Sequence, residues 1–320
     1  MVPPFPWFGG KRQIAARVWE ALGEVVNYVE PFAGSLAVLL ARPMPWRGRE
    51  TVNDADGMIA NFWRALAADP EQVARWADWP VNENDQHARH IWLVGQRASL
   101  TARLEGDPAF YDAQIAGWWV WGISVWIGAG WCAGDGPWMV DDDRQLVHLG
   151  NAGQGVHRQR VHLGNAGQGE EGLYDWFATL AARLRRVRVC CGDWTRVCGP
   201  TPTVKQGLTG VFLDPPYDET MRTDGLYAQE TAGVAQAVRE WAISHGDDPD
   251  YRIVLCGYVG EHTLPSTWRE VAWKARGGYG SQGEDRGREN AERERLWLSP
   301  HCVGSTAGTA YQAPLFAEAR

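Results

Sequence analysis

The chain has 320 residues, of which 45% are hydrophobic and 22% are charged. This composition is typical of a soluble globular protein, either one large α/β domain or a core domain that carries an insertion. No membrane-spanning helix is expected, because the longest apolar run (residues 118–132) is shorter than about 20 residues and is broken by glycines. The first ten residues lack the basic-then-apolar pattern of a signal peptide, so a cytoplasmic location is expected.

The net charge of −8 weighs against a protein that is basic overall, although a local basic face would still suffice to bind nucleic acid. The six cysteines show no C-x-x-C spacing. Reduced structural thiols are therefore expected, with no metal site and no disulfide framework.

The first 60 residues read as the start of an α/β nucleotide site. Residues 25–29 form a β-prone run, residues 30–35 a turn, residues 36–40 the start of a helix, and residues 50–54 a second strand that ends in a carboxylate. Parallel strands of this kind bind ligands beyond their carboxyl ends, near a helix N-terminus.

The middle of the chain has a different character. Residues 61–130 are helical in pattern and rich in Trp and Ala, and the tryptophans of residues 118–131 are expected in a core rather than in a base-stacking platform. A Gly-rich stretch, residues 133–172, contains one unit twice, as residues 147–155 and 161–169. Two short copies do not make a solenoid, so we interpret the stretch as a duplicated, mobile loop. Apolar residues at helical spacing follow, namely Leu173, Phe177, Leu180, Leu184 and Val187.

The α/β alternation then resumes. Strands are predicted at residues 188–191, 210–213 and 251–256, and a helix is predicted around Val234, Ala237, Val238 and Trp241. The expected architecture is an α/β core formed by residues 1–60 and 188–320. A mainly helical insertion, residues 61–187, would interrupt it.

The sharpest motif is Asp214-Pro215-Pro216-Tyr217, directly after an apolar strand. An exocyclic base amine is a poor nucleophile, and a carboxylate and a backbone carbonyl that accept its hydrogens would direct its lone pair toward a methyl donor. The two prolines fix the backbone, and the tyrosine ring offers a face for an extruded base. An ordinary proline turn is the alternative for this motif on its own.

Three further motifs are weaker when taken singly. Trp7-Phe8-Gly9-Gly10-Lys11 would let the backbone approach a ligand and would bring a lysine to a carboxylate. The turn at residues 30–35 lacks the G-x-G-x-x-G of a dinucleotide site, which favours a cofactor without a pyrophosphate. Asp54 ends the second strand, where nucleoside-binding folds hold ribose hydroxyls.

Together, in this order and spacing, the four motifs resemble the Dam-like (DNA adenine methyltransferase) family. The resemblance covers roughly residues 5–66 and 186–300, including the closing segment with Ser281, Gly283, Glu294 and Leu296. It implies a Rossmann-like core dependent on S-adenosyl-L-methionine, with an inserted target-recognition domain. By this resemblance the catalytic residues are Asp214, Pro215, Pro216 and Tyr217, and the donor site comprises Trp7, Gly10, Lys11, Glu30, Pro31, Phe32, Gly34, Asp54 and Asp214.

Two positions in that site are less regular. The family often has a second glycine where this chain has Leu36, which affects the expected donor affinity. Asp193 ends a strand where related folds bind the adenine amine of the donor, so it joins the predicted donor site. A turn or helix cap is the alternative for Asp193.

The predicted function is site-specific methylation of adenine N6 in double-stranded DNA, by base flipping and direct transfer, in a monomer. N4-cytosine, RNA or protein-amide methylation, or an idle DNA-binding relic, are the alternatives; Asp214 at the head of the motif favours adenine. A restriction–modification pairing with a cognate endonuclease stays open. Arg183, Arg185, Arg186 and Arg188 form a basic cluster that either is solvated or contacts phosphates.

Overall fold

A seven-stranded sheet forms the centre of the computed structural model, which describes residues 1–5, 7, 10–126, 131–132, 138–140, 146–148, 172–216, 233–273 and 294–304. The strands are β1 (Asn27–Glu30), β2 (Arg49–Asp54), β5 (Val187–Cys191), β6 (Thr209–Leu213), β7 (Tyr251–Tyr258), β8 (Arg269–Ala272) and β9 (Glu294–Leu298). Their order is β5-β2-β1-β6-β7-β9-β8. The first five in this order are parallel, and β9 is antiparallel to both β7 and β8.

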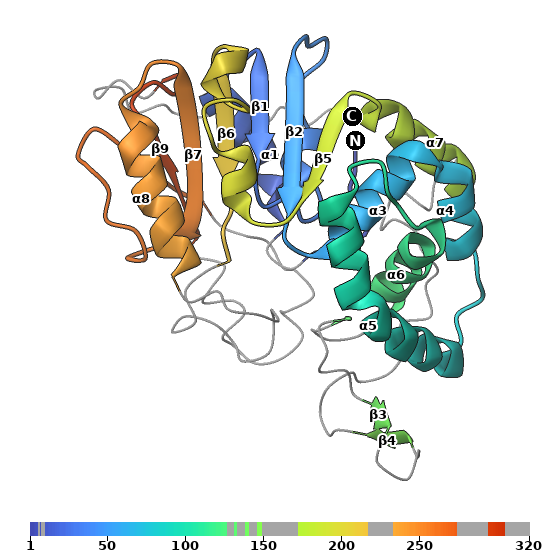
Figure 1. Cartoon of the computed structure of the whole chain (residues 1–320). Helices are drawn as coiled ribbons and strands as arrows, with labels where there is room; N and C mark the ends of the chain where they lie inside the picture. Colours follow the sequence, from blue (N-terminus) through green and yellow to red (C-terminus); the bar gives the residue numbers. More distant parts are fainter. Residues whose placement is uncertain are drawn as a thin grey trace, which may run out of the picture.

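The order of the strands reverses at β1. The chain runs from β1 to β2 and on to β5 on one side, and it returns to pair β6 with the other side of β1 (Figure 1). Open parallel sheets bind ligands in the crevice beyond the carboxyl ends of the strands that flank such a switch point. The fold therefore places a crevice between Glu30, which ends β1, and Asp214, which follows β6.

Neighbouring residues of the central strands point to opposite faces of the sheet. Tyr28 and Phe212 pack with helices α1 (Ala15–Leu22) and α2 (Ala37–Leu40), whereas Val29 and Val211 pack with α8 (Val234–Gly246) and the short helix η3 (Trp194–Val197). The strands are covered on both faces, which explains their nearly continuous apolar sequence.

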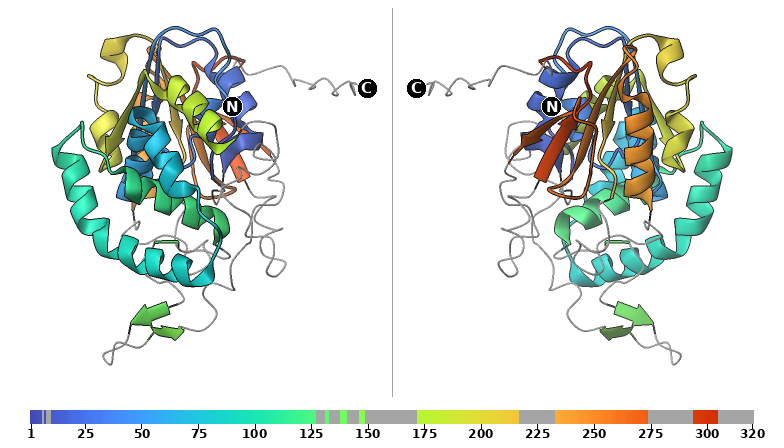
Figure 2. Two further views of the ribbon diagram at one scale, coloured as in Figure 1. Left: turned by 90° about the vertical axis from the view of Figure 1, so that its right-hand side faces the viewer. Right: turned by 90° about the vertical axis from the view of Figure 1, so that its left-hand side faces the viewer.

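Five helices gather beside the β5 edge of the sheet, as Figures 1 and 2 show. They are α3 (Gly57–Ala68), α4 (Pro70–Ala77), α5 (Glu83–Gly106), α6 (Ala113–Val125) and α7 (Leu173–Leu184). Their apolar side chains join the same core as the sheet, since Phe62 and Trp119 belong to one cluster with Val52. None of the helices in the described ranges is long and apolar enough to cross a membrane.

The mixed α/β class and the positions of the strands predicted from sequence are confirmed to within about two residues. The expectation that the tryptophans of residues 118–131 belong to a core is also confirmed, because four of them are buried: Trp119, Trp121, Trp126 and Trp131. The prediction that Val187 continues the apolar face of the helix α7 is wrong. The helix ends at Leu184, and Val187 begins β5, because backbone pairing with Glu50 takes precedence over the helical spacing.

The Gly-rich stretch lies mostly outside the described residues. Within it the structure describes two short antiparallel strands, β3 (Trp138–Val140) and β4 (Leu146–His148). The second copy of the repeat, residues 161–169, is not described. The expected division between a core and an insertion at residue 60 falls inside α3, and it stays a prediction.

Candidate active site

The strand-terminal Asp214 meets Lys11 at the switch point. Lys11 is the first residue of the short helix η1 (Lys11–Gln13), and its Nζ lies 3.0 Å from Oδ1 of Asp214 and 3.7 Å from Oε2 of Glu294. Lys11 and Glu294 are buried, while about a fifth of the Asp214 side chain is exposed. The arrangement leaves Asp214 fixed by a cation on one side and accessible on the other.

Two opposing effects set the pKa of Lys11. Burial alone would lower it, but the carboxylates of Asp214 and Glu294 more than compensate and hold the pKa above its ordinary value. Lys11 is therefore a permanent cation here, which suits it to position a carboxylate and not to exchange protons.

Glu30 occupies the other wall of the crevice, at the end of β1. Its side chain is buried, and the hydroxyl of Tyr28 donates a hydrogen bond of 2.9 Å to Oε2. Burial raises the pKa of Glu30 to about 8, and the nearby Asp214 carboxylate acts in the same direction. Glu30 is thus protonated at neutral pH and can serve as a hydrogen-bond donor.

The turn after β1 is tied to the carboxylate at the end of β2. The backbone N–H of Gly34 donates to Oδ2 of Asp54 at 2.9 Å, and the N–H of Asp56 donates to Oδ1, also at 2.9 Å. Burial, with the Asp56 charge beside it, raises the pKa of Asp54 to about 7. Each oxygen keeps a lone pair that a ligand hydroxyl could use.

Gly34 is required by both conformation and space. Its φ is +45°, and a Cβ atom added there would lie 2.7 Å from Nε1 of Trp7. The indole of Trp63 also donates to the Gly34 carbonyl at 2.9 Å. This turn therefore brings bare backbone against Trp7, at the place where the sequence predicts close approach to a donor.

Leu36, the departure from the family pattern, adopts a left-handed conformation with φ 55° and ψ 27°. That region favours glycine. The Leu36 side chain is fully buried in the core, so apolar packing holds the residue in this conformation. The backbone at Leu36 thus has the left-handed conformation that a glycine would adopt easily, and for a leucine this conformation is strained.

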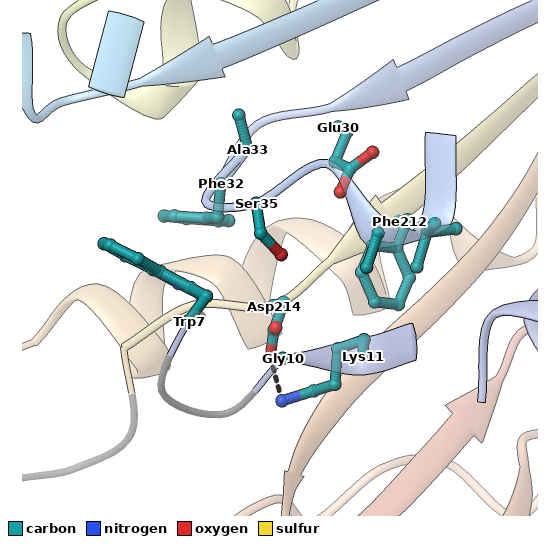
Figure 3. Close-up of a pocket in the computed structure, with 11 residues that line it drawn as sticks. Trp7, Gly10, Lys11, Glu30, Phe32, Ala33, Ser35, Phe212 and Asp214 are labelled. Carbon is teal, nitrogen blue, oxygen red and sulfur yellow. Dashed lines mark ion pairs between the residues drawn. The ribbon is translucent and has the colours of Figure 1, made fainter. Parts of the chain in front are cut away.

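These elements enclose a small cavity, drawn in Figure 3. Its lining includes Trp7, Gly10, Lys11, Glu30, Phe32, Ala33, Ser35, Ala37, Val38, Phe212 and Asp214. In Figure 3 the rings of Trp7 and Phe32 lie on one side, with Phe212 on the other and the Lys11–Asp214 pair between them. The enclosed volume is about 20 Å³, which admits about one water molecule. The cavity is thus the inner end of a site, too small for a whole nucleoside.

The other predicted site residues have varied surroundings. The carbonyl of Pro31 accepts a hydrogen bond from the Asn53 amide, and Phe32 stacks on Trp194 with ring centres 6.3 Å apart. Asp193 is exposed and caps η3 by accepting the Thr195 N–H at 2.9 Å. Pro215 and Pro216 follow β6 as expected, and Tyr217 lies outside the described residues.

The basic cluster before β5 divides into two parts. Arg183 points inward and pairs with the buried Glu50 at 2.6 Å, and Arg42 pairs with the same carboxylate at 3.1 Å. Arg183 is therefore a structural residue, contrary to its assignment to a solvated or phosphate-contacting cluster. Arg185, Arg186 and Arg188 are exposed.

Two site residues, Glu294 and Ser35, are not predicted from the sequence. Glu294 lies in the closing segment that carries the family resemblance, which was the available signal, but its distance from Lys11 in sequence concealed the contact. Ser35 was part of the turn motif without an assigned role, and it lines the cavity.

The switch point between β1 and β6, the glycine turn and the strand-terminal Asp214 are consistent with the fold of a methyltransferase. Residues 7–88 match the family model described as D12 class N6 adenine-specific DNA methyltransferase, which confirms the resemblance to the Dam-like family. That family is one of enzymes. The matched segment includes Trp7, Lys11, the turn at residues 30–35 and Asp54, and it ends before Asp214. No curated protein matches the chain.

Proposed function

We propose that this protein transfers a methyl group from S-adenosyl-L-methionine to N6 of adenine in double-stranded DNA. The observation that carries the proposal is the Lys11–Asp214 contact at the switch point, beside the turn that ends in Gly34. This contact connects residues 7–88, which match the family model, to the Asp-Pro-Pro segment at residues 214–216, which lies outside the match.

The residues present fit the donor. S-adenosyl-L-methionine supplies an electrophilic methyl group on a sulfonium when it is bound. Asp54 would accept hydrogen bonds from the ribose hydroxyls, since each of its oxygens has one backbone donor and one lone pair to spare. Bare backbone at Gly34 and the ring of Trp7 would allow the close contact that such a ligand needs.

Asp214 is the proposed acceptor for the target amine. Its carboxylate and the backbone carbonyl in the Asp-Pro-Pro segment would accept the two amine hydrogens, directing the nitrogen lone pair toward the methyl group. Lys11 would keep the carboxylate charged and oriented, as its distance of 3.0 Å supports. Pro215 and Pro216 would restrain the backbone, and Tyr217 would stack on the flipped base.

We also propose a division of the chain into a catalytic core and a target-recognition domain. Residues 1–60 and 188–320 would form the catalytic core, and residues 61–187 would recognise the target sequence. In Figure 1 the helices α5 and α6 extend below the carboxyl ends of the strands, which supports a role near the substrate. Asp193 would contact the donor adenine, although in the structure its carboxylate caps η3.

Incubation of unmethylated plasmid with the protein and S-adenosyl-L-methionine, followed by nucleoside mass spectrometry, tests the proposal. N6-methyladenine in the product supports it. N4-methylcytosine instead would assign the other amine, and no methylated nucleoside would overturn the proposal. Single-molecule sequencing of the same product would read out the recognition sequence.

A further inference from the structure

A second cavity, of about 680 Å³, runs along the outer edge of β5, away from the switch point. Its size falls within the range of about 300–1,000 Å³ that is usual for ligand sites. β5 forms one wall, and the ends of α3, α5 and α7 with residues 108–111 form the others. We call it the β5 cleft. Its charged lining consists of Arg64, Arg185, Arg188, Arg196 and Glu105.

Four arginines against one glutamate make the β5 cleft basic within a chain whose net charge is −8. Among the described residues, none of these four arginines forms an ion pair. Arg183, a few residues away, shows the contrast, because Glu50 neutralises it. Clustered guanidinium groups without carboxylate partners are typical of a surface that receives an anion.

Arg64 is held rigidly at the wall of the cleft. Its Nε donates to the carbonyl of Val189 at 3.1 Å, and its Nη1 donates to the carbonyls of Leu104 at 2.9 Å and Asp107 at 3.1 Å. The contact with Val189 occupies the free edge of β5, so an added peptide strand would find that edge blocked. The cleft therefore favours an anionic ligand over strand addition.

Two more side chains converge at the carboxyl end of the cleft. A Cβ atom added to Gly192 would lie 2.8 Å from Nη1 of Arg196 and 2.9 Å from Oε1 of Glu105, so both groups reach over this glycine. Burial lowers the pKa of Arg64, while the neighbouring Cys191, Cys190 and Asp107 groups act against this effect. A bound anion would offset the cost of burying this cation.

The position of the cleft relates it to the site of methylation. In the sheet, β5 is three strands from β6, which leads into Asp214. At about 4.8 Å per strand this is about 14 Å across the sheet, and Arg188, three residues before the carboxyl end of β5, lies about 10 Å further back along the strand. The separation is therefore about 17 Å, or about five base pairs along a duplex at about 3.4 Å per pair. A duplex with its target base at Asp214 could thus reach the cleft with its flanking backbone.

We propose that the β5 cleft binds backbone phosphates of the DNA that flanks the target base. The proposal rests on the proposed function and assigns the substrate a second contact surface, with Arg185 and Arg188 as its accessible cations. These two residues give positioning and affinity, without a part in the methyl transfer.

The test compares two double variants that remove the same charge. Arg185→Ala/Arg188→Ala alters the cleft, whereas Arg17→Ala/Lys205→Ala removes two exposed cations, in α1 and in the short helix η4 (Val204–Gln206), that do not line it. Binding to a random-sequence 30-base-pair duplex is measured by fluorescence anisotropy over a salt series. For the cleft variant we expect affinity about tenfold weaker and a salt slope smaller by about 1.8, since about 0.9 is lost per phosphate contact. The control variant should change less than about twofold.

Equal affinities in the cleft variant and the wild type, or equal losses in both variants, would overturn the proposal. Calorimetry with inorganic tripolyphosphate tests a free anion as the source of the phosphates. Tripolyphosphate binding that needs Arg185 and Arg188, with DNA binding unaffected, would overturn the DNA assignment. Methyl transfer at saturating DNA separates the two claims. If the cleft variant loses DNA affinity but the wild type does not methylate DNA, only the proposed function is contradicted. If the wild type methylates DNA but the cleft variant binds DNA normally, only the inference about the cleft is contradicted.

Discussion

The ammonium group of Lys11 lies 3.0 Å from the carboxylate of Asp214, although the two residues come from opposite halves of the chain. Glu294, from the last described strand, lies 3.7 Å from the same ammonium group. One buried cation therefore joins the opening segment, the strand-terminal motif and the start of β9. Its removal would leave two carboxylates close together without compensation.

Lys11→Met should destabilise the fold and weaken donor binding. Removing one partner of a buried ion pair typically costs about 3–5 kcal/mol, and the cost here should lie toward the upper end because Glu294 is also affected. Urea unfolding measures the loss, and calorimetry with S-adenosylhomocysteine measures donor affinity. Arg12→Met, at the exposed neighbouring position, is the control. Equal stability in the two variants would remove Lys11 from its proposed structural role.

Asp214→Asn should lower the methylation rate by at least about a hundredfold, as the loss of a positioned electrostatic contact typically does. The fold should persist, because Asp214 is partly exposed and Glu294 remains near Lys11. The rate is measured on unmethylated plasmid with tritiated donor, and Asp250→Asn, an exposed surface position, is the control. A rate within a few-fold of the wild type would exclude Asp214 from the mechanism.

Much of the site could be predicted from sequence because its residues occupy strand ends. A buried apolar run followed by a carboxylate predicts both the strand and the edge of the sheet where the carboxylate lies, as for Asp54 and Asp214. For Lys11 the sequence predicted only that it would meet a carboxylate and belong to the donor site, and the structure identifies that carboxylate as Asp214. The contact with Glu294 is not predicted, because only the antiparallel return of β9 brings that residue to the switch point.

At Arg183 and Val187 the local sequence pattern predicts the wrong environment. A charge cluster and a helical spacing are visible in the sequence, but long-range partners determine the structure at both positions. The buried Glu50 side chain recruits Arg183, and pairing with β2 places Val187 in a strand. Tertiary contacts of this kind leave no signal in a window of neighbouring residues.

Leu36→Gly should destabilise the protein and leave donor binding unchanged. The glycine relieves left-handed strain of about 1–2 kcal/mol, but deletion of a fully buried leucine costs about 2–5 kcal/mol. Leu36→Ala loses nearly the same side chain and keeps the strain. The glycine variant should therefore be as stable as the alanine variant or more so, the reverse of the order expected at an ordinary position. Urea unfolding of both variants decides it. An alanine variant clearly more stable than the glycine variant would contradict the strain at Leu36.

The stability of the fold should decrease as the pH rises, and Glu30 should be a main cause. Its pKa is raised by burial from an ordinary 4.5 to about 8, so between these values the folded state holds a proton that the unfolded state has released. The stabilisation is complete below about pH 4.5 and is lost as the pH approaches 8, at up to about 1.4 kcal/mol per pH unit.

Glu30→Gln keeps a neutral group that can still accept a hydrogen bond from the Tyr28 hydroxyl, and it cannot ionise. We expect the variant and the wild type to be similar in stability at pH 5 and the variant to be more stable at pH 8.5, as urea unfolding across this range would show. Glu24→Gln, at an exposed position, should follow the wild type at every pH. Parallel curves for Glu30→Gln and the wild type would mean that Glu30 ionises near its ordinary pKa, and the crevice would then hold a charged carboxylate at neutral pH.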